Sequence, residues 1–348
     1  MGELRNLTSR LAPHPPKPPE PSASKAGRNL KAAIPVAVLL LALVALSVVW
    51  RMEVFAVLAF AAMCIALWEA AGAFLNKGHR IPLIPVWCGL LAMTWATWTH
   101  GPLGGFAAFC VAVIAIALCR WASGNFRVSQ RSRAGENHRG SRNTRTVESN
   151  RVDEDSRADE NHPAGKCHRE GDDRCAEDER RDNLWVEDAV ASIFALSWVG
   201  LLGSFAVALA GLHSAEWMIA LLILMPAASD TGGWAFGVLW GRHPMSPSVS
   251  PKKSWEGFVG SLVVSIASSF VLVGSVLGRP WPIALLVGVA AVLCSTVGDL
   301  SESLLKRDLE VKDMGSIFPG HGGMLDRIDS ILMWAPVCYA IMTAPFAR

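Results

Sequence analysis

Long apolar segments alternate with short polar ones along most of this chain of 348 residues. Each apolar segment is close to the ~20 residues that an α-helix needs to cross the hydrocarbon layer of a bilayer. The pattern therefore predicts an all-α, polytopic integral membrane protein with about nine transmembrane helices. The predicted spans are residues 32–50, 54–75, 81–99, 101–119, 188–211, 216–238, 259–278, 281–298 and 330–346.

Two hydrophilic stretches interrupt this pattern. Residues 1–30 are rich in Pro, Ser and basic residues, which is typical of a disordered tail. Residues 123–186 are basic in their first half and acidic in their second, with few aromatic side chains. This predicts a disordered cytoplasmic insert, either a linker or a regulatory, partner-binding segment. On either side of the insert lie N-terminal membrane helices in residues 31–122 and a C-terminal membrane domain in residues 187–348.

Charge and cysteine usage narrow the class of protein. The net charge of +2 does not indicate a nucleic-acid partner, but Lys and Arg gather in loops that alternating spans would place on one side of the membrane. The positive-inside rule puts that side, with the N-terminus and the longer polar loops, in the cytoplasm. Most cysteines lie in or beside apolar spans, and Cys167 and Cys175 with His162 and His168 fit no standard zinc spacing.

Four polar clusters lie within or beside the C-terminal spans. Three are short: SDTGGW with Asp230, SPKKSWEG with Lys252, Lys253 and Ser254, and VGDLSES with Asp299. The fourth runs from Ser303 to Asp329 and is dense in Lys, Arg, Asp and His. Ionisable groups at a membrane edge are costly, so they form a functional hypothesis by default.

Carboxylates and cations occur together in these clusters. Asp299, Asp326 and Asp329 are candidate ligands for Mg²⁺, which usually takes one or two carboxylates together with substrate phosphates and water. Asp326 and Asp329 are three residues apart and share one face of a helix. Asp230 is a candidate for the same role, with helix packing as the alternative. The basic residues suited to phosphate are Lys252, Lys253, Lys306, Arg307 and Lys312. Carboxylates for a metal and cations for phosphate together indicate a nucleotidyl-transfer site.

The segment SESLLKRDLEVKDMGSIFPGHGGMLDRID resembles the signature of the phosphatidate cytidylyltransferase (CDP-diacylglycerol synthase) family, in which S-x-x-K-R-x₄-K-D precedes H-G-G-x-x-D-R-x-D. The residues that fill this pattern are Ser303, Lys306, Arg307, Lys312, Asp313, His321, Gly322, Gly323, Asp326, Arg327 and Asp329. The three shorter clusters also resemble elements of the family. The resemblance therefore covers residues 188–346 firmly and the first four spans only by their character.

This resemblance implies an integral enzyme of a bacterial plasma membrane that joins CTP to phosphatidic acid, giving CDP-diacylglycerol and pyrophosphate. It also implies Mg²⁺ on Asp299 and Asp326, K⁺ at a second metal position, and a homodimer. The residues then expected in catalysis are Lys306, Arg307, Lys312, Asp313, His321 and Asp329, with His321 orienting phosphate rather than abstracting a proton. The residues expected to bind substrate are Lys252, Lys253, Ser254, Ser303 and Arg327.

Two other functions stay open from the residues alone. A transporter also carries carboxylates in apolar spans, although it would place them near the midplane and show repeated halves. A CTP-using lipid kinase shares the substrate chemistry but releases CDP in place of pyrophosphate. Two acidic residues complete the set of candidates: Asp308 is interpreted as an ion-pair partner in its loop, and Glu69 is either a buried partner of a basic group or a site residue.

Overall fold

The computed structural model describes residues 13, 30–148, 185–246, 250–315, 317 and 322–345, with the backbone alone at residues 30–37, 123–148, 251 and 252. The chain forms two compact units. The first is made of Met1–Val113 and Ala191–Arg348, and the second of Ile114–Val190. All of the site described below belongs to the first unit.

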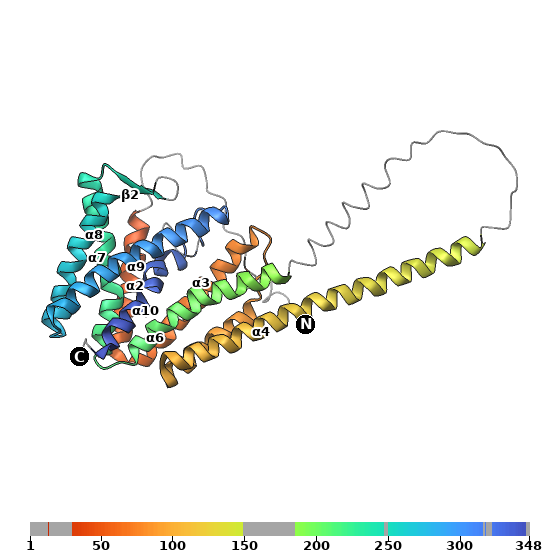
Figure 1. The fold of residues 1–348 in the computed structure, drawn as a ribbon, viewed down its shortest axis with the longest axis horizontal. Helices are drawn as coiled ribbons and strands as arrows, with labels where there is room; N and C mark the ends of the chain where they lie inside the picture. Colours follow the sequence, from red (N-terminus) through yellow and green to blue (C-terminus); the bar gives the residue numbers. More distant parts are fainter. Residues whose placement is uncertain are drawn as a thin grey trace. The chain divides into compact units, whose positions relative to one another are not determined.

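Helices make up nearly all of the described structure, as the apolar pattern predicts (Figure 1). The all-α membrane fold is therefore confirmed. In chain order the helices are α2 (Leu30–Trp50), α3 (Met52–Leu75), α4 (Leu83–Glu148), the π-helical η1 (Leu196–Leu201), α6 (Leu202–Ala210), α7 (Ala215–Trp240), α8 (Trp255–Ser269), the π-helical η2 (Phe270–Val276), α9 (Trp281–Asp308) and α10 (Leu325–Thr343). A short antiparallel hairpin of β1 (Pro244–Ser246) and β2 (Ser250–Ser254) joins α7 to α8.

Six helices in the described part of the chain are long and apolar enough to cross a membrane, by length and composition. They are Met52–Leu75, Leu83–Ala122, Trp185–Ala210, Ala215–Trp240, Trp255–Val276 and Trp281–Asp308. The predicted number of about nine spans is not confirmed, although each predicted segment falls on a helix. The difference arises because the side chains of α2 are described only from Val38 to Trp50, α4 covers two predicted spans, and the first two turns of α10 carry three charged residues, Asp326, Arg327 and Asp329.

α4 contains two helices that meet at Gly101. The backbone there leaves the helical region, with φ 72° and ψ −169°, a conformation open to glycine, and Pro102 follows as the first residue of the second helix. A Cβ placed on Gly89 would lie 2.8 Å from the Cβ of Ala112. Residues at similar separations on either side of Gly101 therefore touch, so the chain folds back as a helical hairpin.

Both hydrophilic stretches fall mainly outside the described residues. The backbone of α4 continues to Glu148, but residues 149–184, with both cysteines and both histidines of the insert, lie outside. The disordered insert at 123–186 and the disordered tail at 1–30 therefore stay predictions. Within the second unit, Nη2 of Arg120 lies 2.9 Å from Oδ2 of Asp188, and both side chains are nearly buried.

The core of the first unit surrounds α10, which packs against α3, α6, α7 and α9. Trp334, near the middle of α10, is fully buried, and its Nε1 donates to the carbonyl oxygen of Leu221 at 3.2 Å. A tryptophan in a membrane protein is usually an interfacial anchor, but this one is accepted in the core because its N–H finds a carbonyl. The packing of α10 fixes the place of Asp326 and Asp329 in its first two turns.

Candidate active site

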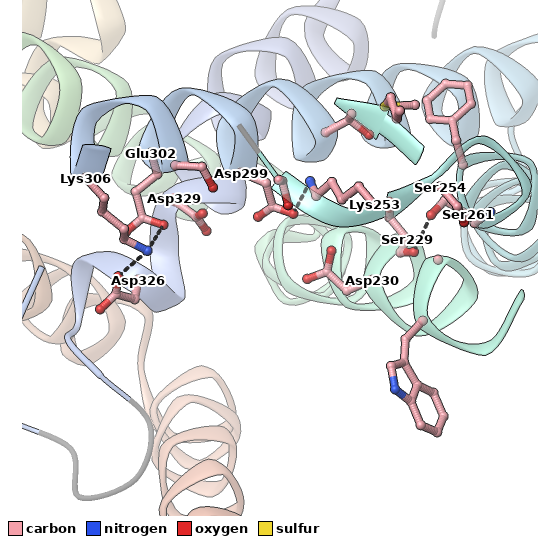
Figure 2. A pocket seen from close by; sticks show the side chains of 18 of the residues that line it. Ser229, Asp230, Lys253, Ser254, Ser261, Asp299, Glu302, Lys306, Asp326 and Asp329 are labelled. Atoms are coloured by element: carbon pink, nitrogen blue, oxygen red, sulfur yellow. Dashed lines mark hydrogen bonds and ion pairs between the residues drawn. The ribbon is translucent and has the colours of Figure 1, made fainter. Parts of the chain in front are cut away.

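A polar cavity of about 500 Å³ lies among α7, the β1–β2 hairpin, α8, α9 and α10 (Figure 2). The sequence-predicted residues that line it are Asp230, Lys253, Ser254, Asp299, Ser303, Lys306, Asp313, Asp326, Arg327 and Asp329. All four polar clusters of the sequence therefore contribute to one site.

Four predicted site residues are not among the lining residues. Arg307 and Lys312 are described and exposed, but they do not line this cavity. His321 lies outside the described residues, and the side chain of Lys252 is likewise outside them. The roles predicted for these four residues stay predictions.

Close packing of α7 on α8 builds one wall of the cavity. A Cβ on Gly232 would lie 2.6 Å from the carbonyl oxygen of Gly260, so the two backbones are in contact at this point. One turn away, the Oγ of Ser261 donates to the carbonyl oxygen of Ser229 at 2.6 Å. Such small residues let helices approach without a side chain between them. Asp230, next to Ser229, is thereby placed on the cavity wall.

Ser254 has a structural task at the start of α8. Its Oγ accepts a hydrogen bond from the backbone N–H of Gly257 at 3.1 Å, which is the usual contact of a serine N-cap. This cap ends β2 and begins the helix, and it fixes the residue before it, Lys253. Ser254 therefore caps α8, a role that the sequence analysis did not assign to it. Its predicted contact with substrate stays a prediction.

Asp299 on α9 connects the hairpin to α10. Its Oδ2 lies 2.5 Å from Nζ of Lys253, and its Oδ1 accepts from the Oγ of Ser330 at 3.0 Å. α10 comes this close because Gly298 has no side chain: a Cβ there would lie 2.9 Å from the carbonyl oxygen of Asp329. The carboxylate of Asp299 is therefore held between one cation and one hydroxyl.

A second lysine, Lys306, bridges two buried carboxylates. Its Nζ lies 2.8 Å from Oε2 of Glu302 and 2.6 Å from Oδ1 of Asp326. The other oxygen of Asp326 accepts from the backbone N–H of Gly323 at 2.6 Å. Glu302 was missed by the sequence reasoning. Its position four residues before Lys306 on one helix face is the signal that would have found it.

The site thus has two lysine-centred groups, Lys253 with Asp299 and Lys306 with Glu302 and Asp326. Asp329 lies between them, close enough to interact with both Asp299 and Glu302 (Figure 2). It is buried, and its Oδ1 accepts from the backbone N–H of Ser330 at 2.6 Å. Asp326 and Asp329 thus share one face of α10, as the spacing predicts. Glu69 does not line the cavity and accepts instead from the backbone N–H of Leu325 at 3.0 Å.

Carboxylate oxygens, which are suitable metal ligands, predominate among the polar groups around the cavity. Among the described lining residues there are six carboxylates, from Asp230, Asp299, Glu302, Asp313, Asp326 and Asp329, and three cations, from Lys253, Lys306 and Arg327. Oε1 of Glu302 is buried and has no hydrogen-bond partner among the described atoms. Among the described residues, no three His, Cys, Asp or Glu side chains are arranged so that they could hold a metal ion by themselves. The site still fits Mg²⁺, since this ion commonly takes only one or two carboxylates with phosphates and water.

Comparison with known proteins identifies the family of this chain. The profile of the cytidylyltransferase family matches residues 31–344. The chain is 33% identical over 327 residues to a phosphatidate cytidylyltransferase of Mycobacterium bovis, covering 93% of this chain and 92% of that protein. It is 32% identical over 320 residues to a phosphatidate cytidylyltransferase of Mycobacterium leprae, covering 92% of this chain and 89% of that one.

The chain belongs to the cytidylyltransferase family. The family expected from the signature is confirmed, and the protein is an enzyme, a nucleotidyltransferase. The match extends over the N-terminal helices as well, where the sequence showed a resemblance only by character. A chloroplastic phosphatidate cytidylyltransferase of Arabidopsis thaliana is 37% identical over 155 residues, which is 42% of this chain and 36% of that one.

Proposed function

We propose that this enzyme transfers the cytidylyl group of CTP to phosphatidic acid, releasing pyrophosphate and leaving CDP-diacylglycerol in the membrane, and that it requires Mg²⁺. The observation that carries the proposal is the cavity itself. Two lysines and a cluster of carboxylates line one space among apolar, membrane-spanning helices. The relatives that match over 92% and 93% of the chain are phosphatidate cytidylyltransferases, which supports the lipid substrate.

The reaction needs positioning and charge neutralisation. A phosphate oxygen of phosphatidic acid attacks the α-phosphorus of CTP. The bond between the α-phosphorus and the oxygen that links it to the β-phosphate breaks, and pyrophosphate leaves in line. The attacking phosphate is largely ionised near neutral pH, so no side chain has to remove a proton. The protein's task is therefore to bring two anionic substrates together and to offset their charge.

Lys253 and Lys306 are the described lysines that face this space. Each ammonium group has three donors. Lys253 bonds to one carboxylate and Lys306 to two, so each has a donor left for a phosphate oxygen. Arg327, which also lines the cavity, is suited to a bidentate contact with phosphate. These three cations would orient the substrates and the leaving pyrophosphate.

Asp299 and Asp326 would hold Mg²⁺, with Asp230 as a further candidate ligand and K⁺ as the occupant proposed for a second position. Bound there, the ion would supply positive charge beside the nucleotide phosphates. Glu302 and Asp329 would keep the surroundings of Lys306 anionic and so hold its ammonium group in place. With Lys306 held in place, the carboxylates of Asp299 and Asp326 would stay directed at the space where the phosphates enter.

One feature of the rim favours a lipid over a soluble acceptor. Trp234 lines the cavity, and its residue surface is 71% exposed. Trp234 lies in the last two turns of α7, and an exposed tryptophan in that part of a membrane helix is typical of the headgroup region. A cavity that opens beside it would receive a phosphate carried on a lipid headgroup.

The test is a product analysis with the full-length protein in detergent. We expect CTP, phosphatidic acid and Mg²⁺ to give CDP-diacylglycerol and pyrophosphate in equal amounts. Release of CDP with a phosphorylated lipid would show a kinase instead. No nucleotide turnover by folded protein, with several lipid acceptors supplied, would refute the proposed reaction.

A further inference from the structure

The loop between α9 and α10 carries Lys312 and Asp313 and leads into Asp326. Helix α3, together with Asn76 that follows it directly, holds both ends of this loop. At the start of the loop, Nδ2 of Asn76 donates to the carbonyl oxygen of Leu309 at 2.9 Å. At its end, Oε2 of Glu69 accepts from the backbone N–H of Leu325 at 3.0 Å. Glu69 and Asn76 are seven residues apart, close to two helical turns, so they lie on the same side of α3. One face of α3 therefore spans the loop.

Glu69 supplies a cap that α10 lacks. The residue before α10, Met324, makes no side-chain hydrogen bond to the helix. The first backbone N–H groups of a helix have no partner within it and carry partial positive charge. Glu69 accepts from the first of them, at Leu325. A carboxylate from a helix more than 200 residues away in sequence thus caps the N-terminus of α10, where the loop ends.

The loop backbone closes tightly around this carboxylate. Glu69 is only 2% exposed. A Cβ placed on either Gly315 or Gly323 would run into its carboxyl group, so both glycines lie directly against it. Within the described part of the chain, the hydrogen bond that Glu69 makes across to the loop goes to the backbone N–H of Leu325. Its contacts in the loop are made to the backbone, which is what a positioning role requires.

The residue that Glu69 positions is Asp326. Asp326 follows Leu325 directly, and its Oδ2 accepts from Gly323, whose backbone lies against Glu69. Its Oδ1 lies 2.6 Å from Nζ of Lys306. The backbone on the N-terminal side of Asp326 is thus fixed at two points by one side chain, and a shift there would move the carboxylate relative to Lys306.

We propose that Glu69 is a positioning residue of the active site, which acts by accepting the backbone N–H of Leu325 and so sets the place of Asp326. This rests on the proposed function in so far as Asp326 serves the cytidylyl transfer. The property that matters is the reach of an acceptor oxygen to Leu325. Negative charge at Glu69 is secondary.

Two variants separate reach from charge. Glu69→Gln keeps a carbonyl oxygen at the same distance and removes the charge. Glu69→Asp keeps the charge and withdraws the oxygens by one methylene. The matched control is Glu53→Gln, because Glu53 is on the same helix, and its side chain is 56% exposed with a partner in Arg51.

The full-length chain in nanodiscs is measured in two ways: turnover, and amide hydrogen exchange of peptides covering residues 322–329. We expect Glu69→Asp to lower kcat by about 10–100-fold, the range found when a residue that orients a metal-binding side chain is lost. Exchange in these peptides should be about tenfold faster, because a local opening that exposes Leu325 becomes easier. Glu69→Gln and Glu53→Gln should stay within about threefold of the wild type in both measurements.

Equal damage in Glu69→Gln and Glu69→Asp would overturn the proposal, because charge and not reach would then be the property that matters. Wild-type values in Glu69→Asp would overturn it too. If Glu69→Asp does not fold, Glu69→Gln decides: protected peptides and retained turnover support the proposal, and loss of either refutes it. A wild type that makes no CDP-diacylglycerol would refute the proposed function, while the exchange measurement would still report on Glu69.

Discussion

The two lysine-centred groups of the cavity use the same chemistry at different depths. The side chains of Lys253 and Asp299 are 29% and 30% exposed, and Lys253 lies on a two-stranded hairpin. The side chains of Lys306, Glu302 and Asp326 are 18%, 5% and 8% exposed, and all three lie on packed helices. Water can replace a lost partner in the first group, whereas in the second an unpaired charge stays buried. The cavity thus combines a lysine that is free to change partners with one that is fixed.

The largest effect is expected at the carboxylates that each group directs at the cavity. Asp299→Asn and Asp326→Asn should each lower kcat by at least about 10²–10³-fold, because each removes a carboxylate that would hold Mg²⁺ beside the reacting phosphates. Turnover with CTP and phosphatidic acid measures this, and Asp308→Asn, an exposed carboxylate at the end of α9, is the control. Retained turnover in either of the first two variants would contradict its proposed metal role.

Replacing each lysine by methionine tests the difference in depth. Lys306→Met leaves Glu302 and Asp326 buried without their cation, so the free energy of unfolding should fall by about 3–5 kcal/mol. Lys253→Met removes a partly exposed pair and should cost about 1 kcal/mol or less, while activity is still lost. Denaturant titration in mixed micelles measures both values. Equal destabilisation by the two variants would show that the groups do not differ as their exposure indicates.

The wall that carries Asp230 and leads to Lys253 depends on contact between α7 and α8. Gly232→Val would place a side chain against the carbonyl oxygen of Gly260, so the helices must separate, at a cost of about 1–3 kcal/mol. Turnover should fall as well, since Asp230 and Lys253 move apart. Gly274→Ala is the control, because its nearest neighbour would be 4.0 Å away. Unfolding curves and turnover that are alike for the two variants would refute this packing argument.

The smallest effect is expected at an exposed pair beside the α9–α10 loop. Nζ of Lys77 lies 2.7 Å from Oε1 of Glu310, and this hydrogen bond lowers the pKa of the Glu310 carboxyl from its ordinary value. A lowered pKa in the folded state adds stability at neutral pH that is lost as the pH falls through the acid range. Because both groups are exposed, Glu310→Gln should leave thermal unfolding and turnover unchanged at pH 7 and physiological salt. A clear loss of turnover would show that the loop needs this pair as well as Glu69.

The sequence predicted the membrane class, the family and the polar clusters that meet in the cavity. These features are local, because apolar runs of helix length, and a signature of fixed spacing from Ser303 to Asp329, are each visible within one short stretch. The shared face of Asp326 and Asp329 follows from helix geometry alone. The break at Gly101 falls between the predicted spans 81–99 and 101–119, but the number of spans was less predictable, because α10 combines an apolar stretch with three charged residues in its first two turns.

The tertiary structure decided which partner each polar side chain has. Lys253 meets Asp299 across 46 residues, and Glu69 meets Leu325 across 256, and no pattern along the chain encodes such separations. Arg307 and Lys312 stayed outside the cavity for the same reason, whereas the cap made by Ser254 and the pairing of Glu302 with Lys306 are local contacts that spacing alone could have indicated. Periodicity and spacing determine what a helix presents on its faces, but only the packing of α3, α7, α8, α9 and α10 determines which of those faces meet.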